Sequence, residues 1–187
     1  MRRSEESLRE SKAQSMMHQI RAERPGDENA VFEVNSQAFG RKTEANLVDQ
    51  LRTNCPLRVS LVAEQEGAIL GHILFTPARI EDGMAETNGM GLAPLAVLPS
   101  HQRQGIGSAL VRTGLAQLRA AGVLFVAVVG HPRYYPKFGF KKASTYGIRC
   151  EYGQVPDEAF MILVFHPQVF QGVRGIVRLR PEFAAAV

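Results

Sequence analysis

The fold is decided by one stretch near the middle of the chain, which reads Gln102-Arg103-Gln104-Gly105-Ile106-Gly107-Ser108. A strand-like apolar segment precedes it, and apolar residues recur at helical spacing after it, as far as Ala121. The pattern therefore predicts a loop that opens a helix, and Gly122 is the expected C-terminal cap of that helix.

The start of this helix has the properties of a phosphate-binding site. The first turn of a helix offers unpaired backbone N–H groups and the positive end of the helix dipole. Gly105 and Gly107 place no side chain there and Arg103 adds a positive charge, so a phosphate group can approach the amides closely. The stretch predicts a pyrophosphate cradle, although a lone Gly-x-Gly also serves as a plain turn into a helix.

Two other phosphate-binding motifs are excluded by the residues around this stretch. A P-loop requires a Gly-Lys pair before Ser or Thr, and the chain contains no Gly-Lys pair. A dinucleotide-binding fingerprint requires a third glycine and an acidic residue about 20 positions further on, and neither is in place.

Outward from this stretch, the sequence predicts strands and two further helices. Strands are expected at residues 18–23, 59–64, 69–76, 91–97, 123–129, 144–151 and 159–166, with a further candidate at 172–179. Asp27 is expected to cap a helix that runs to Phe39, and Thr43 to cap a second helix that ends before Pro56. Pro94 cannot donate to a strand ladder and predicts a bulge in its strand.

Length and composition bound the remaining possibilities. The 187 residues predict one domain at 17–187 behind a charged, flexible tail at 1–16. The net charge is +4, but no Lys/Arg run with interleaved aromatic residues occurs, so nucleic acid is not an expected partner. Neither a membrane span nor a secretory signal is expected. The two cysteines, Cys55 and Cys150, form no metal or redox motif and fit a cytoplasmic protein.

At this point the chain resembles a known family. The motif Gln-x-x-Gly-x-Gly, after a strand that ends Leu95-Ala96-Val97, resembles the acetyl-CoA motif of the GNAT acetyltransferase superfamily. The apolar run 123–129 is similar to that family's fifth strand, and Tyr135-x-x-x-Gly139-Phe140 to its Tyr-x-x-x-Gly-Phe signature. The resemblance covers about residues 17–166, and the run Gly-His-Pro-x-Tyr-Tyr-x-Lys-Phe-Gly-Phe is similar to a bacterial branch of the superfamily.

The resemblance implies a fold and a cofactor site. The fold would be α/β (α+β), with a mixed, mostly antiparallel sheet of about six to seven strands and about four flanking helices. Strands four and five would splay apart, and acetyl-CoA would lie in the gap without any metal. The residues implied to bind it are Leu95, Ala96, Val97, Gln102, Arg103, Gln104, Gly105, Ile106, Gly107 and Ser108.

The resemblance also implies an activity, direct transfer of the acetyl group to a primary amine of a small molecule or a protein. By motif alignment Tyr135 is the general acid, with packing over the cofactor sulfur as its alternative role, and Tyr134 is expected to face the opposite way. The glutamate that some relatives carry as a base is replaced by Gly91. Glu81, Glu86 and His131 are therefore candidate bases, and a water chain is a further alternative. For His131 a structural role in its loop is favoured over that of the base.

One alternative from another class stays open, because the usual glutamate is missing. The chain would then be a non-catalytic acyl-CoA sensor or an interaction module with the same fold. Either protein could be a monomer, or a homodimer formed through the strand at 173–179.

Overall fold

The computed structural model describes residues 18–83, 85–168 and 170–185. The tail predicted at 1–16 lies outside these residues. The strands are β1 (Gln19–Ala22), β2 (Val59–Gln65), β3 (Ala68–Asp82), β4 (Ala85–Val97), β5 (Phe125–Val129), β6 (Lys141–Lys142), β7 (Ile148–Cys150), β8 (Phe160–Val164) and β9 (Gly175–Arg178). The α-helices are α2 (Glu28–Phe39), α3 (Thr43–Asn54) and α4 (Ile106–Ala120), and 3-10 turns are η1 (Pro99–His101), η2 (Tyr135–Phe138), η3 (Ala143–Tyr146) and η4 (Pro181–Ala185).

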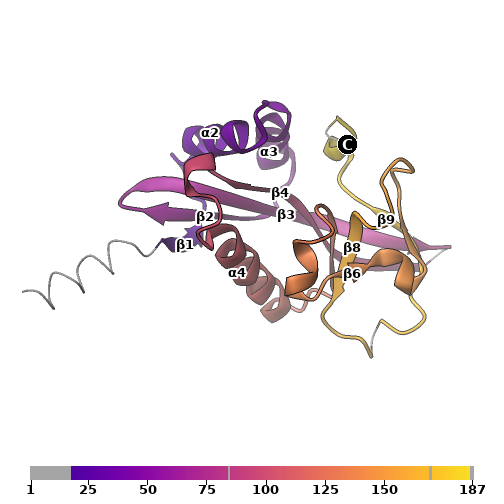
Figure 1. Cartoon of the computed structure of the whole chain (residues 1–187). Helices are drawn as coiled ribbons and strands as arrows, with labels where there is room; N and C mark the ends of the chain where they lie inside the picture. The colour runs from indigo at the N-terminus through magenta and orange to yellow at the C-terminus, as the bar shows by residue number, and fades with distance from the viewer. Residues whose placement is uncertain (1–17, 84, 169, 186–187) are drawn as a thin grey trace, which may run out of the picture.

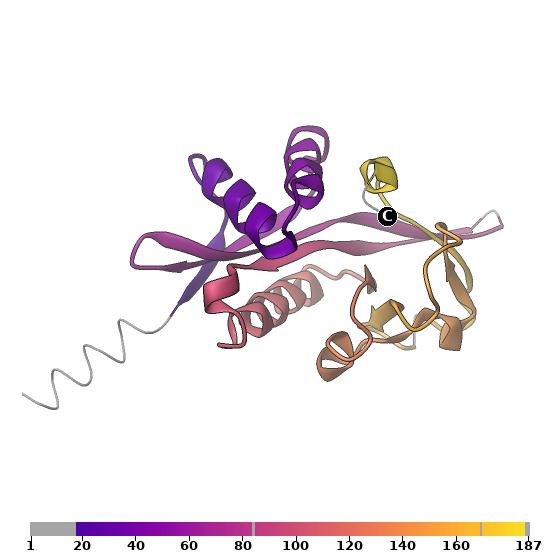
Figure 2. The same ribbon diagram turned by 45° about the horizontal axis from the view of Figure 1, so that its top comes forward.

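The elements form three layers around one sheet. The long hairpin of β3 and β4 runs through the length of the molecule (Figure 1). Helices α2 and α3 and the C-terminal turn η4 lie on one face of this hairpin, and α4 lies on the other (Figure 2). The two faces of the sheet therefore carry separate apolar cores, one beneath each set of helices.

The sheet is mostly antiparallel and has the order β1-β2-β3-β4-β5-β8-β6. The exceptions are β4 with β5 and β7 with β9, which pair in parallel. Strand β4 pairs with β5 only from Met90 to Leu92, so the two strands separate over the last residues of β4. The separation begins at a bulge, because Ala93 and Pro94 together face Leu74 of β3. The predicted bulge at Pro94 is thus confirmed.

Helix α4 packs closely on β3 through a glycine. Gly114 faces the ring of Phe75, and a Cβ atom on this glycine would lie 2.3 Å from Phe75 Cε2. Leu110, Leu115 and Leu118 of the same helix are buried in the core on this side. The helical apolar stripe read from the sequence is therefore the face that α4 presents to the sheet.

The numbers of strands and helices among the described residues differ from those expected. They form nine strands instead of about six to seven, and three α-helices instead of about four. The strand expected at 144–151 is reduced to β7, because Gly147 adopts a left-handed φ of +69° and ends the turn η3 just before it. At the C-terminus, the strand considered for dimerisation is β9, which pairs with both β3 and β7 of its own chain.

The two predicted helix caps are wrong in detail. Asp27 occupies the N-cap position of α2, but its carboxylate makes no capping hydrogen bond. It binds instead the guanidinium of Arg21, with 2.6 Å between Nη1 and Oδ2. Thr43 is the first residue of α3, and Lys42 is the N-cap. Among the helices that the structure describes, none is long and apolar enough to cross a membrane.

Candidate functional site

Two adjoining cavities mark the place where β4 and β5 separate. The first, here called the gap cavity, has a volume of about 440 Å³ and is lined on its strands by Leu92 to Leu95 and Ala127 to Val129. The second, the loop cavity, measures about 620 Å³ and lies over the loop that leads into α4. Leu95 and Tyr134 line both, so the two cavities adjoin at these residues.

The two glycines of the loop serve different purposes. Gly105 is the N-cap of α4 and has a left-handed φ of +88°, a conformation that favours glycine. Gly107 lies within the first turn of α4, where a Cβ atom would stand 2.9 Å from the hydroxyl of Tyr134. The first glycine allows the turn of the backbone, and the second keeps the wall of the loop cavity open.

The loop cavity has the charge of an anion site. Arg103 and Lys137 line it, and none of the described residues around it carries a carboxylate. Arg103 also has a φ of +62°, which is uncommon for a residue with a side chain. The backbone N–H groups of the first turn of α4 add donors that have no acceptor within the helix. This arrangement fits the pyrophosphate predicted from the sequence.

The predicted binding residues divide into those that face the site and those that support it. Leu95 and Val97 line the loop cavity, whereas Ala96 packs into the core under α2 and α3. Gln102 lines the loop cavity, and its amide nitrogen also donates to the carbonyl of Val97 at 3.1 Å. Two other side chains hold the loop in place. Gln104 donates to the carbonyl of Ser100 at 3.2 Å, and Ile106 is buried in the core.

The two adjacent tyrosines both reach the site, although Tyr134 was expected to face the opposite way. Tyr135 is buried at 7% exposure and lines the gap cavity. Tyr134 stands between the two cavities, with its phenol hydrogen-bonded to the side chain of Ser108. Burial raises the pKa of both phenols, and that of Tyr135 the more. Both therefore stay protonated at neutral pH.

The candidate bases occupy different parts of the molecule. His131 lines the gap cavity, but its Nδ1 accepts a hydrogen bond from the backbone N–H of Arg133 at 3.3 Å. In this tautomer the proton of a neutral imidazole sits on Nε2. Glu81 and Glu86 form ion pairs with Arg79 on the distant part of the β3–β4 hairpin and line neither cavity. Neither glutamate is placed to take a proton from a group bound in the gap.

At Gly91, where some relatives carry a glutamate, Leu179 of the C-terminal segment occupies the space that a side chain would take. A Cβ atom on Gly91 would lie 2.7 Å from Cδ2 of Leu179. Leu179 itself lines the gap cavity. A longer side chain at position 91 would have to displace this leucine, so the glycine and the leucine form a matched pair.

Sequence reasoning missed one charged residue of the gap cavity, Glu44. This residue is 7% exposed and lies in the first turn of α3. An acidic residue is common in the first turn of any helix, because it complements the helix dipole. The sequence therefore gave no reason to single it out.

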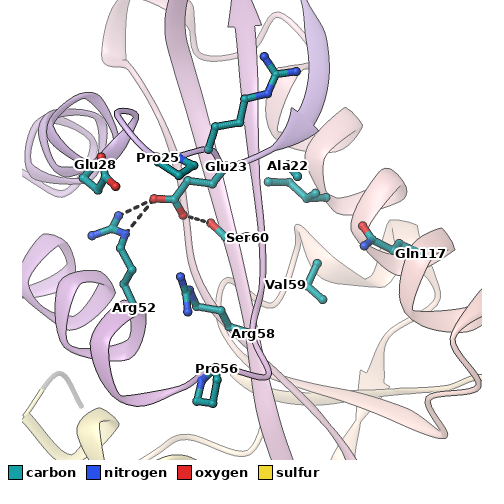
Figure 3. Close-up of a pocket in the computed structure, with 12 residues that line it drawn as sticks. Ala22, Glu23, Pro25, Glu28, Arg52, Pro56, Arg58, Val59, Ser60 and Gln117 are labelled. Carbon is teal, nitrogen blue, oxygen red and sulfur yellow. Dashed lines mark hydrogen bonds and ion pairs between the residues drawn. The ribbon is translucent and has the colours of Figure 1, made fainter.

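A third cavity, of about 340 Å³, lies beside β1, β2 and α3 and shares no lining residue with the other two. Figure 3 shows Glu23 between Arg52 and Ser60 in this cavity, with 2.7 Å between Arg52 Nη2 and Glu23 Oε1. Ser60 continues the network into the core, where its hydroxyl lies 3.0 Å from Nε2 of the buried His72. The charged side chains here pair with one another, and these pairs hold β1, β2 and α3 together.

A splayed pair of parallel strands that opens toward an anion cradle at a helix N-terminus defines the class of GNAT-type acyltransferases. Residues 19–143 match the acetyltransferase (GNAT) domain family. The chain belongs to this family, as its motifs suggested.

Relatives in sequence and in structure agree with this membership. N-acetyltransferase YjhQ of Escherichia coli K12 is 42% identical over 135 residues, which are 71% of this chain and 74% of YjhQ. YhbS of the same strain is 32% identical over 165 residues, 88% of this chain and 97% of YhbS.

Two crystal structures with bound cofactor are also similar. E. coli YhbS in complex with CoA superposes with a TM-score of 0.82 at 29% identity, over 89% of this chain and 92% of that one. A GNAT family acetyltransferase from Brucella melitensis in complex with acetyl-CoA gives a TM-score of 0.73 at 37% identity, over 89% and 98% of the two chains.

Proposed function

We propose that the protein transfers the acetyl group of acetyl-CoA to a primary amine of a small molecule or a protein. The observation that carries this proposal is that the loop and gap cavities adjoin, with Leu95 and Tyr134 in the walls of both. One extended ligand can place a pyrophosphate against the first turn of α4 and its far end between β4 and β5. The structures of similar proteins with CoA and acetyl-CoA support this choice of ligand.

The backbone of this chain provides the contacts for such a ligand. After Leu92 no strand in the described residues pairs with the edge of β4 that faces away from β3, so backbone groups on this edge can bind the pantetheine arm. The amides of the first turn of α4 and the charge of Arg103 would hold the pyrophosphate. Bound acetyl-CoA supplies an activated thioester.

Tyr135 is the proposed general acid. Its side chain lines the gap cavity, and burial raises the pKa of its phenol above the ordinary value of 10.0. The phenol is therefore available to protonate the thiolate that leaves when the amine attacks the thioester. His131 is the proton acceptor proposed from the sequence, and its hydrogen bond from Arg133 argues against that role.

The decisive experiment is calorimetric titration of the purified protein with acetyl-CoA, with CoA and ATP as parallel ligands. Micromolar binding of acetyl-CoA that exceeds binding of ATP is the expected result. Failure of the folded protein to bind acetyl-CoA would exclude the proposed reaction. Binding without thiol release in the presence of amines would indicate instead the non-catalytic sensor.

A further inference from the structure

Residues from elements on both faces of the sheet line the gap cavity. Tyr134 and Tyr135 line it from the part of the chain that follows β5, next to the loop cavity. Phe39 and Leu47 line it from α2 and α3, and Phe183 from η4. Helices α2 and α3 and turn η4 lie on the face of the sheet opposite α4 (Figure 2). A cofactor held at α4 therefore leaves the α2–α3–η4 side of the gap cavity to a second substrate.

This second-substrate side is strongly apolar. Its walls are formed by Phe39, Leu47, Leu179 and Phe183, and Phe39 is 40% exposed. An apolar or aromatic body of the substrate would remove this surface from water. A small polar amine or an extended polycation would gain little from the same walls.

One charge faces this apolar side. Glu44 is the sole carboxylate among the described residues that line the gap cavity. Both of its oxygens accept from Arg41: Nη2 lies 2.5 Å from Oε1, and Nε donates to Oε1 and Oε2 at 3.1 Å. The side chain of Arg41 is 61% exposed, whereas that of Glu44 is 9% exposed. Arg41 does not line the cavity and holds the carboxylate from the solvent side. A carboxylate offers about four lone-pair sites, so the Glu44 carboxylate beside this apolar cavity can bind one cationic group in addition to Arg41.

From this arrangement we infer that the acceptor is a primary amine carried on an apolar body, and that Glu44 is the residue that binds its ammonium group. The inference rests on the proposed acetyl transfer. In that reaction the ammonium loses two protons as the N–C bond forms and the C–S bond breaks. One proton goes to the leaving thiolate and the other to solvent.

The test compares acceptors and two matched variants in an assay of thiol release from acetyl-CoA. The acceptors are 2-phenylethylamine and n-hexylamine against ethanolamine and spermidine. Glu44→Gln removes the charge and keeps the size of the side chain, and Arg41→Gln breaks the same ion pair from the other end. If the pair were only structural, both variants would lose activity alike.

The expected result is that the two apolar amines have values of kcat/KM at least about tenfold above those of ethanolamine and spermidine. Glu44→Gln should lower kcat/KM for 2-phenylethylamine by about tenfold or more, chiefly through KM, as removal of a charge-assisted contact predicts. Arg41→Gln should lower it by a clearly smaller factor, because the carboxylate itself remains. Calorimetry should give both variants the acetyl-CoA affinity of the wild type.

Three results would overturn the inference: a preference for ethanolamine or spermidine, equal losses in the two variants, or no turnover of any of the four amines by protein that binds acetyl-CoA. Loss of acetyl-CoA binding by the wild-type protein is a different failure. It would remove the proposed function itself, so the two conclusions are tested separately.

Discussion

The hydroxyl of Tyr134 lies 2.9 Å from the position that a Cβ atom on Gly107 would occupy. The same tyrosine lines both cavities, and its phenol is hydrogen-bonded to Ser108 in the first turn of α4. Position 107 therefore controls two features at once, the space of the loop cavity and the placement of the ring that separates it from the gap cavity.

Gly107→Val should weaken acetyl-CoA binding by at least about tenfold, because the new side chain would enter the space between the helix and Tyr134. The φ of Gly107 is not in the left-handed region, so the substitution adds no backbone strain. Calorimetry would measure the affinity. Gly153→Ala, where a Cβ atom would meet nothing within 4 Å, is the control. Unchanged affinity in Gly107→Val would show that the pyrophosphate binds elsewhere.

Tyr135→Phe should lower kcat by about 100-fold if the phenol is the general acid. Tyr134→Phe removes the contact with Ser108 and should affect the KM for acetyl-CoA more than kcat. Steady-state kinetics of both variants would separate the roles. A larger loss of kcat in Tyr134→Phe than in Tyr135→Phe would identify Tyr134 as the general acid.

The same assignment predicts the alkaline part of the pH profile. Burial raises the pKa of Tyr135 above 10.0, so the phenol keeps its proton through neutral and mildly alkaline pH. The rate of the wild-type enzyme should therefore not decline through loss of this proton below about pH 10. A decline between pH 8 and 9 that disappears in Tyr135→Phe would contradict a phenol whose pKa is raised.

His131→Ala should lower kcat/KM by less than about threefold, well short of the loss that removal of a general base produces. The reason is the hydrogen bond from the N–H of Arg133 to Nδ1, which leaves the proton on Nε2. The thiol-release assay measures this effect. A hundredfold loss, together with disappearance of an acidic limb in the pH profile, would restore His131 as the base.

Gly114→Ala should destabilise the fold by about 1–3 kcal/mol, the usual cost of overpacking a core. In an exposed helix the same change stabilises, so the sign of the effect reports the contact. Urea unfolding would measure it. The double variant Gly114→Ala/Phe75→Leu should lose less stability than the two single variants added together, since the added methyl group then replaces atoms of the ring. Strictly additive effects would mean that the two residues do not interact.

Stability should fall in mild acid because of His72. Burial lowers its pKa to about 4 from 6.5. Below pH 6.5 the unfolded chain therefore binds a proton that the folded chain excludes until about pH 4. As the pH falls from 6.5 to about 4, the contribution of His72 to the free energy of unfolding therefore decreases by up to about 1.4 kcal/mol per pH unit. Urea midpoints at pH 7 and pH 5 should converge in His72→Gln but not in the control His18→Gln.

Much of this site could be predicted from local sequence, because the relevant interactions are local. The cradle at Gly105 and Gly107 and the bulge at Pro94 follow from residues close together in the chain. The separation of β4 and β5 was implied only by the resemblance to the family. The contacts that remained hidden join distant segments. Leu179 reaches Gly91, and Glu44 meets the strands only through the packing of α3 on the sheet.

The orientation of the two tyrosines shows the same limit. The sequence predicts that Tyr134 faces away from the site, opposite to Tyr135. The tyrosines instead flank the start of the 3-10 turn η2, where their rings lie edge to face with centroids 5.2 Å apart. Both side chains can therefore reach the gap cavity, and a motif alone does not distinguish their roles.

The C-terminal segment completes the gap cavity from residues far from the loop that opens α4. Phe160, Leu179 and Phe183 of the cavity wall lie beyond residue 143, where the family match ends. The gene therefore encodes the loop and much of this wall in separate stretches. Substitutions downstream of residue 143 can reshape the wall and leave the loop at Gly105 and Gly107 unchanged.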